Sequence, residues 1–538
     1  ASDVYKRQTQ HCVATVLLSY AENLVILPKP IIINTMKHKL PYIVLFAAAL
    51  SGSCTMSEDK GTNYYFDSAN GSDANEGTAP GSAWKSLEKI KDVNLAPGDS
   101  VLLKRGSRFE CAVEFTAHGG EGSPIVIDAY GPGEDPCIAA PDSSLYAVAI
   151  YNSDYVTLQN IEVVNTGSQR IAGRTGVLVK CENYGTSHGI TLNSLYIHDV
   201  NGSLVKEEGG GSAILIKNGW DSDSTVSVFD HLTIKNCIIR RCERNAMIWS
   251  APWSRTDWHL STNTLVQGNL IEGVPGDGIV PIGCDGAIIE YNLMRDCPMT
   301  LPDTEAAAGI WPWSCDNTII RFNEVSDHKA PWDAQGFDSD YNCTNTHIEY
   351  NYSHDNDGGF VLICNSGTCR EPHSVGNTGT VISYNISYGD AIRQRPTRVG
   401  TFSPTIHIAG PCDSTLIENN IFFITPKPSD KVDRHAVWSD SWDGYASRTT
   451  FRDNVFYTTE PSKFDFTQST DNVFEGNYFY GKFNSVPLEN NIEVPSDSLT
   501  QILPSLLTEV PIANGKATIK TVDKEAIERY FKTLKSNE

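Results

Sequence analysis

The sequence predicts an all-β protein whose chain winds into a right-handed parallel β-helix, and three observations lead to this class. A nine-residue pattern recurs, with a cysteine first, an asparagine last and an apolar pair between them. Apolar residues at helical spacing are nearly absent between residues 100 and 480. Successive asparagines, from Asn269 to Asn477, are separated by 23, 31, 28, 34, 35, 34 and 23 residues. A basic period near 23 with insertions is typical of one β-rich coil repeated along an axis.

The cysteines belong to this repeat. The clearest copies are CDGAIIEYN (284–292), CDNTIIRFN (315–323), CTNTHIEYN (343–351) and CDSTLIENN (412–420), and NTGTVISYN (377–385) carries asparagine in place of cysteine. Fourteen cysteines in an exported protein would ordinarily indicate disulfides. Their repeated position predicts instead a ladder of buried thiols inside the coil, with disulfide bridges as the alternative.

The N-terminal region resembles an export signal. Met36 opens MKHKLPYIVLFAAALSGSC, which has a basic start, a short apolar run and small residues, so residues 36–54 are expected to be a signal peptide. Residues 1–35 are expected not to belong to the native protein. The end of the signal resembles a bacterial lipobox, which predicts lipidation of Cys54; ordinary cleavage and secretion is the alternative. We therefore expect a periplasmic, surface-anchored or secreted protein of a Gram-negative bacterium, without a transmembrane span.

The remaining chain divides into the β-helix, expected over residues 64–480, and a C-terminal extension over 481–538. A solenoid must cover its first and last coils. The segments 83–93 and 522–535 both carry apolar residues on one helical face, and we expect them to form short capping helices at the two ends. The formal net charge of -23 argues against nucleic acid and anionic membrane surfaces as partners.

A second repeated strand precedes each cysteine. It reads GIVPI (278–282), GIWPW (309–313), GFDSD (336–340), GFVLI (359–363) and TIHIA (405–409). Side chains alternate along a strand, so if the second residue of each copy points inward, the third and fifth point outward. This alternation places Asp338 and Asp340 on the outer face, beside Trp311 and Trp313 of the preceding coil, with Val361 and Ile363 outward on the next.

This grouping suits carbohydrate chemistry, because tryptophans stack on sugar rings while two carboxyl groups protonate the leaving oxygen and activate water. Side chains two residues apart on a strand are separated by about 6.6 Å, which favours an inverting pair. The predicted catalytic residues are Asp338 and Asp340, with Asp333, Asp355, Asp357 and Asp277 as substitutes. The predicted substrate-binding residues are Trp311, Trp313, Trp332, His354, Trp253, Arg393, Arg395 and His407. Each aspartate also has a simpler explanation as a solvated or turn-forming residue, and the tryptophans as packing beneath loops.

The segments YYFDSANGSDANEGTAPGSAWKSLEKI (64–90) and LAPGDSVLLKRG (95–106) resemble the N-terminal part of bacterial carbohydrate-active proteins of the pectin-lyase-like superfamily. The pairing of WDAQGFDSD with SHDNDGGF is most similar to β-helical glycoside hydrolases, of which family 141 is the one it resembles. The resemblance implies the fold and a carbohydrate substrate, but the superfamily includes hydrolases, lyases and esterases.

We therefore expect a glycoside hydrolase that needs no metal. The first alternative is a polysaccharide lyase that binds Ca²⁺ through Asp338, Asp340, Asp355 and Asp357. Its base would be Arg393, Arg395 or Lys329. The second alternative is a non-catalytic glycan-binding surface protein, which would carry aromatic residues without a working carboxyl pair.

Overall fold

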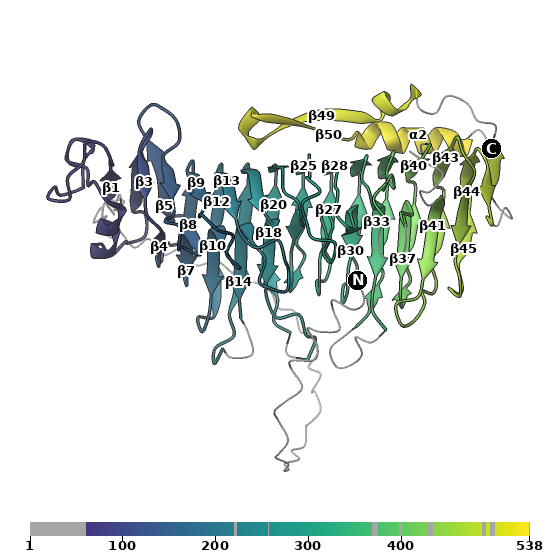
Figure 1. Cartoon of the computed structure of the whole chain (residues 1–538), viewed down its shortest axis with the longest axis horizontal. Coiled ribbons are helices and arrows are strands. Elements are labelled where there is room, and N and C mark those ends of the chain that lie inside the picture. Colours follow the sequence, from purple (N-terminus) through teal and green to yellow (C-terminus); the bar gives the residue numbers. More distant parts are fainter. Residues whose placement is uncertain are drawn as a thin grey trace, which may run out of the picture. The chain divides into compact units, whose positions relative to one another are not determined.

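The computed structural model describes residues 61–219, 223–256, 258–367, 375–396, 401–424, 426–427, 434–486, 491–494 and 501–536. The expected signal peptide and Cys54 lie outside these ranges. The described chain is a parallel β-helix, as predicted, whose strands stack into three long walls (Figure 1). Within the described residues, no helix has the length and apolar character needed to cross a membrane.

Most coils contribute one strand to each wall, in the same order. For example, the chain runs from β8 (Val156–Gln159) to β9 (Glu162–Asn165) to β10 (Thr175–Cys181) before the next coil begins. The first sheet has 14 strands, from β1 (Asn63–Phe66) to β45 (Val473–Glu475). The second also has 14, from β3 (Arg108–Glu110) to β48 (Ile492–Val494). The strands thus continue beyond residue 480, where we expected the β-helix to end.

The third sheet consists of two six-stranded parts. The first contains β4 (Val113–Phe115), β7 (Tyr146–Tyr151), β10, β14 (Ser212–Asn218), β18 (Asn245–Ser250) and β22 (Ile279–Val280). The second contains β30 (Gln335–Ser339), β33 (Gly359–Cys364), β37 (Ile406–Ala409), β41 (His435–Asp440), β44 (Ser462–Asp465) and β47 (Phe483–Asn484). Between them, Ile310 makes single bridges to Ile279 and to Phe337. Pro281 and Pro312 lack the N–H that a regular ladder needs, which explains the interruption.

The repeated asparagines form a continuous buried ladder that runs parallel to the axis. The side-chain amide of Asn323 donates to Asn351 Oδ1 at 3.0 Å, and that of Asn351 donates to Asn385 Oδ1 at 3.0 Å. The same contact continues from Asn385 to Asn420 and from Asn420 to Asn454. Each asparagine also donates to a backbone carbonyl of the preceding coil, as Asn351 does to Ile320 at 2.8 Å. The ladder therefore satisfies buried backbone groups at every turn.

The cysteine ladder is confirmed for the described residues. All eleven cysteines there carry free thiols, and those of the repeat are buried. The thiols of Cys315 and Cys343 donate to the carbonyl oxygens of Pro281 and Pro312, at 3.5 and 3.4 Å. The alternative of disulfide bridges is wrong for this part of the chain.

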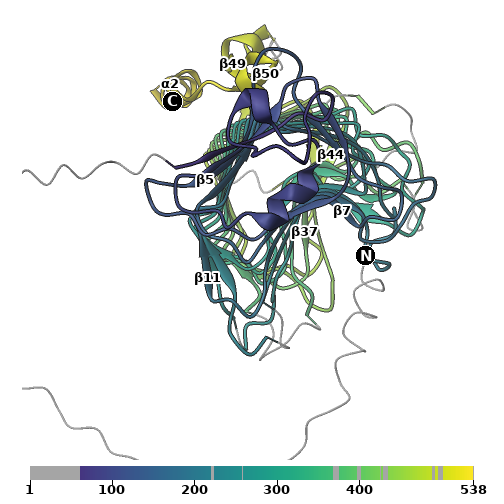
Figure 2. The same ribbon diagram turned by 90° about the vertical axis from the view of Figure 1, so that its left-hand side faces the viewer.

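The two predicted caps have different outcomes. The N-terminal cap is the 3-10 helix η2 (Leu87–Asp92), which buries Leu87 and Ile90 against the core and crosses the end of the coil (dark purple in Figure 2). The C-terminal helix α2 (Lys524–Ser536) exists, but it is not an end cap. With the hairpin of β49 (Leu507–Ile512) and β50 (Ala517–Val522), it lies along the second sheet (Figure 1). Helix α2 and the hairpin lie along this sheet because they bury a strip of aromatic and aliphatic side chains on it.

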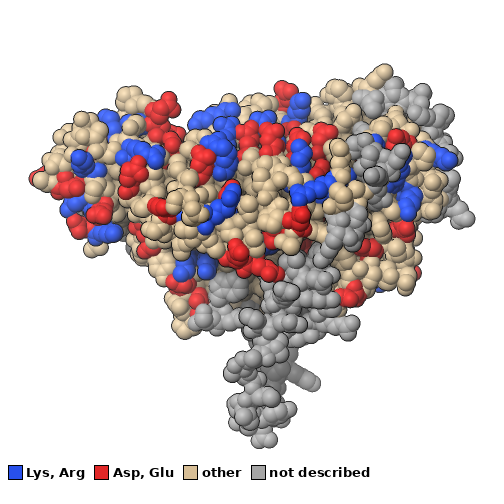
Figure 3. All heavy atoms as spheres, in the orientation of Figure 1, with Lys and Arg blue, Asp and Glu red and all other residues tan. Residues whose placement is uncertain are grey.

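The surface charge is distributed without a large patch of one sign over the described part of the face in Figure 3. Basic and acidic side chains alternate from one coil to the next, as in the row Arg240, Glu272 and Arg295 of the second sheet. Such rows offset like-charge repulsion locally, although the chain as a whole has a net charge of -23.

Candidate active site

Strand β30 carries Asp338 on its outer face, as the alternation predicted. Phe337 is fully buried in the core, and the Ser339 hydroxyl lies 2.9 Å from that of Thr380 inside the coil. Asp338 pairs in register with Leu362 of β33, and Leu362 pairs in the same way with His407 of β37. The outer face of the third sheet is thus a row of residues from successive coils.

Asp338 is buried more deeply than an outward strand residue usually is. Its side chain is 3% exposed, and Oδ1 has no hydrogen-bond partner among the described residues. Burial, followed by the charges of Asp333, Asp340 and Asp277, raises the pKa of Asp338 well above its ordinary value. Burial and these like charges favour the protonated form of the carboxyl group, which has little access to solvent.

Asp340 is half-buried and lies at the end of the same strand. Its Oδ1 accepts hydrogen bonds from the Tyr341 N–H at 2.6 Å and from the Cys364 thiol at 3.1 Å. Burial raises the pKa of Asp340 to about 6, while the hydrogen bonds from Cys364 and Tyr341 and the charge of Lys206 act in the opposite direction. This value suits a group that must donate a proton near neutral pH.

Asp333 reaches the same place from the loop before β30. It belongs to the short strand β29 (Trp332–Asp333), which pairs with β26 (Ala306–Ala307), and its side chain is half-buried. Its backbone is left-handed, with φ of 57°. Burial raises the pKa of Asp333, and the positive charges of His407, Arg393 and Lys206 oppose that rise. After burial, the charge of Asp333 is the largest influence that raises the pKa of Asp338.

Asp277 is a structural residue beneath the site. It is fully buried, forms an ion pair with Arg244, and accepts hydrogen bonds from the Ala308 N–H at 3.1 Å and the Trp311 indole at 3.2 Å. Burial opposes its ionisation, but Lys206 and Arg244 lower the pKa of Asp277 below its ordinary value. Lys206 also lies over the Trp311 ring, 5.1 Å from its centroid. Trp311 is only 4% exposed, so the structure does not present it to a ligand.

The other tryptophans near β30 are more open. Trp253 and Trp313 are half-buried and stack with centroids 5.5 Å apart and ring planes inclined at 14°. The Trp332 indole donates to the carbonyl of Asp303 at 2.9 Å, which ties the loop of Asp333 to the loop before it. The structure therefore brings Trp253, Trp313 and Trp332 together with Asp333, Asp338 and Asp340.

One part of the predicted outer face is displaced by a residue. Val361 and Ile363, expected outward, are buried in the core, whereas Leu362 and Cys364 point outward. The cause is the start of β33, where Gly359 has φ of 122° and Val361, not Phe360, pairs with Phe337. This shift places the Cys364 thiol against Asp340.

His354 and Asp355 lie on the second sheet, not at this site. Nδ1 of His354 lies 2.8 Å from Asp355 Oδ2 and Nε2 lies 3.1 Å from Glu324 Oε1. Although burial disfavours the charged ring, these contacts raise the pKa of His354 to about 9. Glu324 also accepts the Lys520 N–H of β50 at 2.6 Å, so the cluster fixes the C-terminal hairpin.

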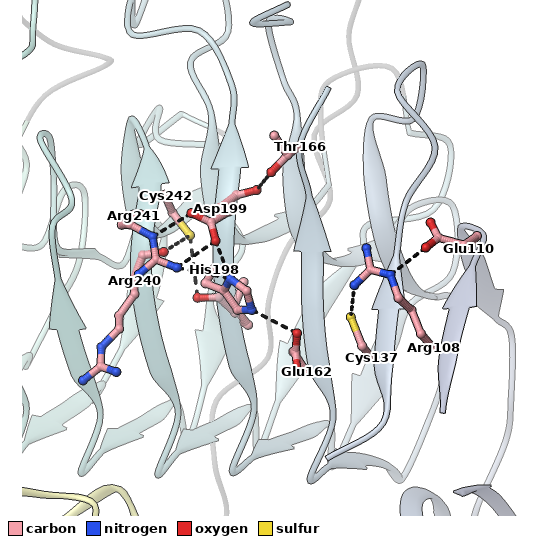
Figure 4. A network of polar contacts seen from close by, with 11 residues as sticks. Arg108, Glu110, Cys137, Glu162, Thr166, His198, Asp199, Arg240, Arg241 and Cys242 are labelled. Atoms are coloured by element: carbon pink, nitrogen blue, oxygen red, sulfur yellow. Dashed lines mark hydrogen bonds and ion pairs between the residues drawn. The ribbon is translucent and has the colours of Figure 1, made fainter. Parts of the chain in front are cut away.

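The same cluster occurs earlier in the chain, which supports its structural role. Figure 4 shows His198 of β13 (Tyr196–Asn201), with Nδ1 2.6 Å from Asp199 and Nε2 3.2 Å from Glu162. In both copies a tyrosine two residues earlier packs on the imidazole, at 4.2 Å for His198 and 4.5 Å for His354. We therefore leave His354 and Asp355 out of the candidate site.

Arg393, Arg395 and Asp357 hold loops in place. The buried Arg393 guanidinium donates to the carbonyls of Ala330 and Pro331, at 2.6 and 3.1 Å, and to that of Asp333. Arg395 forms an ion pair with Asp303. Asp357 is buried, and burial raises its pKa against the charge of Arg393. Arg393 therefore positions the Asp333 loop and is not open to a ligand.

The proposed calcium ligands do not converge. Asp355 pairs with His354 on another sheet, and among the described residues no group of three or more His, Cys, Asp or Glu side chains is arranged to hold a metal ion. Asp338, Asp340, Asp355 and Asp357 thus do not fit a calcium site.

Sequence reasoning missed several residues at the site. Lys206 comes from the loop before β14, and Tyr341, Cys364 and Trp442 surround Asp340 and its neighbours. No local motif marks Lys206, Tyr341, Cys364 or Trp442, because only the stacking of distant coils brings them together.

His407, predicted to bind substrate, is 4% exposed, with Nε2 3.0 Å from Asp440 Oδ1.

Comparisons with known proteins agree with this architecture. A family model described as "Right handed beta helix region" matches residues 257–421. A lacto-N-biosidase of Bifidobacterium longum subsp. longum is 28% identical over 495 residues, which cover 71% of this chain but 30% of that protein. The chain therefore spans less than a third of that curated relative.

Two solved structures also match most of this chain. The native GH136 lacto-N-biosidase of Eubacterium ramulus matches with a TM-score of 0.53 and 26% identity, over 68% of this chain and 66% of that one. Its selenomethionine derivative matches with a TM-score of 0.53 and 24% identity, over 72% and 67%. These similarities support a right-handed parallel β-helix. They give no support to glycoside hydrolase family 141, which the sequence resembled.

Proposed function

We propose that the protein is a glycoside hydrolase in which Asp340 and Asp333 act on the glycosidic bond. The observation that carries this proposal is a pair of half-buried carboxyl groups, Asp333 in the loop before β30 and Asp340 at the end of β30, of which Asp340 has a pKa of about 6. Asp338, our first choice from sequence, is too buried to contact a substrate.

The two groups differ in electrostatic environment, which suggests their roles. Asp340 is the general acid, because its raised pKa keeps a useful fraction protonated at mildly acidic pH. It donates its proton to the glycosidic oxygen as the bond from that oxygen to C1 breaks. Burial raises the pKa of Asp333 as well, but the nearby charges of Arg393 and Lys206 oppose that rise. Asp333 then either takes a proton from the attacking water or attacks C1 itself, before water releases the sugar.

The similarity to lacto-N-biosidases suggests the substrate. We propose oligosaccharides that carry a lacto-N-biosyl unit as the first candidates, within the broader class of host and plant glycans. The inverting outcome was favoured by the spacing of Asp338 and Asp340, and that reason no longer applies once Asp338 is set aside. Proton NMR of the anomer first released distinguishes inversion from retention.

The test compares Asp333→Asn, Asp338→Asn and Asp340→Asn, with Asp285→Asn as a control that lies away from the site. We expect Asp340→Asn and Asp333→Asn to lose about 10²–10⁴-fold in kcat on an oligosaccharide that ends in a lacto-N-biosyl unit, whose sugar leaving group needs protonation. Asp338→Asn and the control should remain within a few-fold of wild type. Full activity in both Asp333→Asn and Asp340→Asn would contradict the proposal.

Product analysis separates hydrolysis from the lyase alternative. New reducing ends without absorbance near 235 nm indicate hydrolysis. A rise in that absorbance that EDTA abolishes would indicate a calcium-dependent lyase. Arg393 argues against the lyase, because its guanidinium donates to the carbonyls of Ala330, Pro331 and Asp333.

We also propose that the protein is exported, as the sequence of residues 36–54 predicts, and that Cys54 is lipidated. Labelled fatty acid should enter the wild-type protein in a Gram-negative host and not Cys54→Ser. Secretion of unlabelled wild-type protein would support ordinary cleavage instead.

A further inference from the structure

A group of aromatic side chains lies on the outer face of the third sheet, beyond the carboxyl groups. It consists of Phe402, Trp438 and Trp442, all half-buried, and we name it the aromatic platform. The rings of Phe402 and Trp438 are 4.4 Å apart between centroids and inclined at 59°. Trp438 follows His407 in register, so it continues the row that contains Asp338 and Leu362.

The buried His407 supports this platform. Its ring makes edge contacts with Phe402, at 4.9 Å and 71°, and with Trp442, at 5.8 Å and 85°. Asp440, at 3.0 Å, fixes the orientation of the imidazole. Rings that are held from below in this way lose little conformational entropy when a ligand binds to them.

The platform is continuous with the candidate active site. Trp442 contacts Tyr341, with centroids 6.3 Å apart at 78°, and the Tyr341 N–H donates to Asp340. Trp442 and Trp313 both pack on the apolar cluster of Tyr341, Leu362, Cys364 and Ala409. An aromatic surface therefore extends to both sides of Asp340 along the axis.

The dimensions suit a chain of sugars. From β30 to β41 there are three steps between neighbouring strands, which at about 4.8 Å each place Trp438 about 14 Å from Asp338 along the axis. Two or three linked pyranose rings span that distance. Partly exposed aromatic faces are suited to the apolar faces of pyranose rings, and the polar edges of the rings remain free for water.

We propose that the aromatic platform is a binding subsite for the sugars of an oligosaccharide that are remote from the cleaved bond. The inference rests on the proposed hydrolase and deepens it. The substrate is then an oligosaccharide that lies along the β-helix axis, from the stack of Trp253 and Trp313, past Asp340 and Asp333, to Trp438. Chain length beyond the cleaved unit contributes to binding.

The experiment measures kcat/KM on two probes, a 4-nitrophenyl lacto-N-bioside and oligosaccharides that extend the same unit by two to four sugars. We expect Trp438→Ala to lower kcat/KM on the extended chains about tenfold, mainly through KM, and to change the aryl glycoside less than threefold. Trp438→Phe keeps an aromatic face and should recover most of the loss. Equal effects on both probes, or none on either, would overturn the proposal.

A second measurement keeps the platform testable if the protein hydrolyses neither probe. Wild type and Trp438→Ala are applied to an array of host and plant oligosaccharides. Binding by wild type that is lost in Trp438→Ala and retained in Trp438→Phe supports the platform even though the hydrolase proposal fails. If wild type binds no oligosaccharide of the array, the subsite proposal is wrong.

Discussion

Replacing Asn351 by alanine tests how much the buried asparagine ladder stabilises the β-helix. Asn351 is fully buried. Its Oδ1 accepts from the backbone N–H of Asn323 at 2.9 Å and from the Asn323 side chain at 3.0 Å. Its amide donates to Ile320 O at 2.8 Å and to Asn385 Oδ1 at 3.0 Å. Alanine removes all four hydrogen bonds and keeps the one from its own backbone N–H to Asn385.

The expected loss follows from these contacts. A hydrogen bond contributes about 1 kcal/mol net, and a buried group left without a partner costs about 1–3 kcal/mol. Three of the bonds at about 1 kcal/mol each, together with the Asn323 N–H left buried without a partner at about 1–3 kcal/mol, give a loss of about 4–6 kcal/mol in the free energy of unfolding. This loss is comparable to the whole stability of many domains, so we expect a large decrease in the denaturation midpoint.

The matched control is Asn193→Ala. Asn193 also bonds to the neighbouring coils, to Gln159 and Asn236, but on the half-exposed outer face of the first sheet. Water replaces those bonds, so we expect a loss of about 1 kcal/mol or less. Urea denaturation followed by circular dichroism gives the midpoints, and amide hydrogen exchange shows whether the coils around Asn351 open first. Equal losses in the two variants would refute the reasoning, because burial would then add nothing to the ladder.

Three further predictions concern the site and its support. Because the Cys364 thiol stabilises ionised Asp340, Cys364→Ala should raise the pKa of Asp340, and activity that requires protonated Asp340 should persist to higher pH. In wild type the alkaline limb of kcat/KM is expected near pH 6. In Cys364→Ala this limb should move to higher pH by up to about one unit, whereas in Cys364→Ser it should stay nearly in place. A shift to lower pH in Cys364→Ala would contradict the assignment. Asp277→Ala should cost about 3–5 kcal/mol in unfolding free energy because it breaks the buried ion pair with Arg244, which then keeps only Glu305, and an unchanged thermal midpoint would exclude that role. Removal of residues 501–536 should expose the apolar strip of the second sheet and cause aggregation, measurable by light scattering, whereas a monomeric and equally stable product would show that the hairpin and α2 are dispensable.

The sequence was sufficient for the fold because each coil repeats the same physical requirements. The spacing of the asparagines predicted the repeating coil but not their buried hydrogen-bond ladder, whereas the position of the cysteines predicted the free buried thiols. The placement of α2 was not predictable in the same way. Its apolar stripe shows that the helix is covered on one side, but the same stripe fits the end of a coil or a sheet face. The strip of aromatic and aliphatic side chains that receives it is assembled from several coils.

The candidate site was predictable in position and only partly in its members. Alternation along β30 correctly placed Asp338 outward, but alternation contains no information about what covers an outward side chain. Loops from neighbouring coils bury Asp338 and leave Asp340 and Asp333 half-exposed. The same limit applies at β33, where one glycine with positive φ shifts the alternation and brings Cys364 to Asp340.

The location of the site follows from the architecture itself. In a β-helix, every insertion before a strand of the third sheet leaves the coil at the same edge, so loops that are distant in sequence stack side by side. Lys206, Glu305 and Asp333 come from three such loops, and Arg244 and Asp277 connect them below the surface. Regular pairing of the third sheet is interrupted at Pro281 and Pro312, just before β30. A stack of long loops beside an interrupted ladder holds charged groups where regular strands alone would not, and this explains why the carboxyl groups with raised pKa gather at this coil.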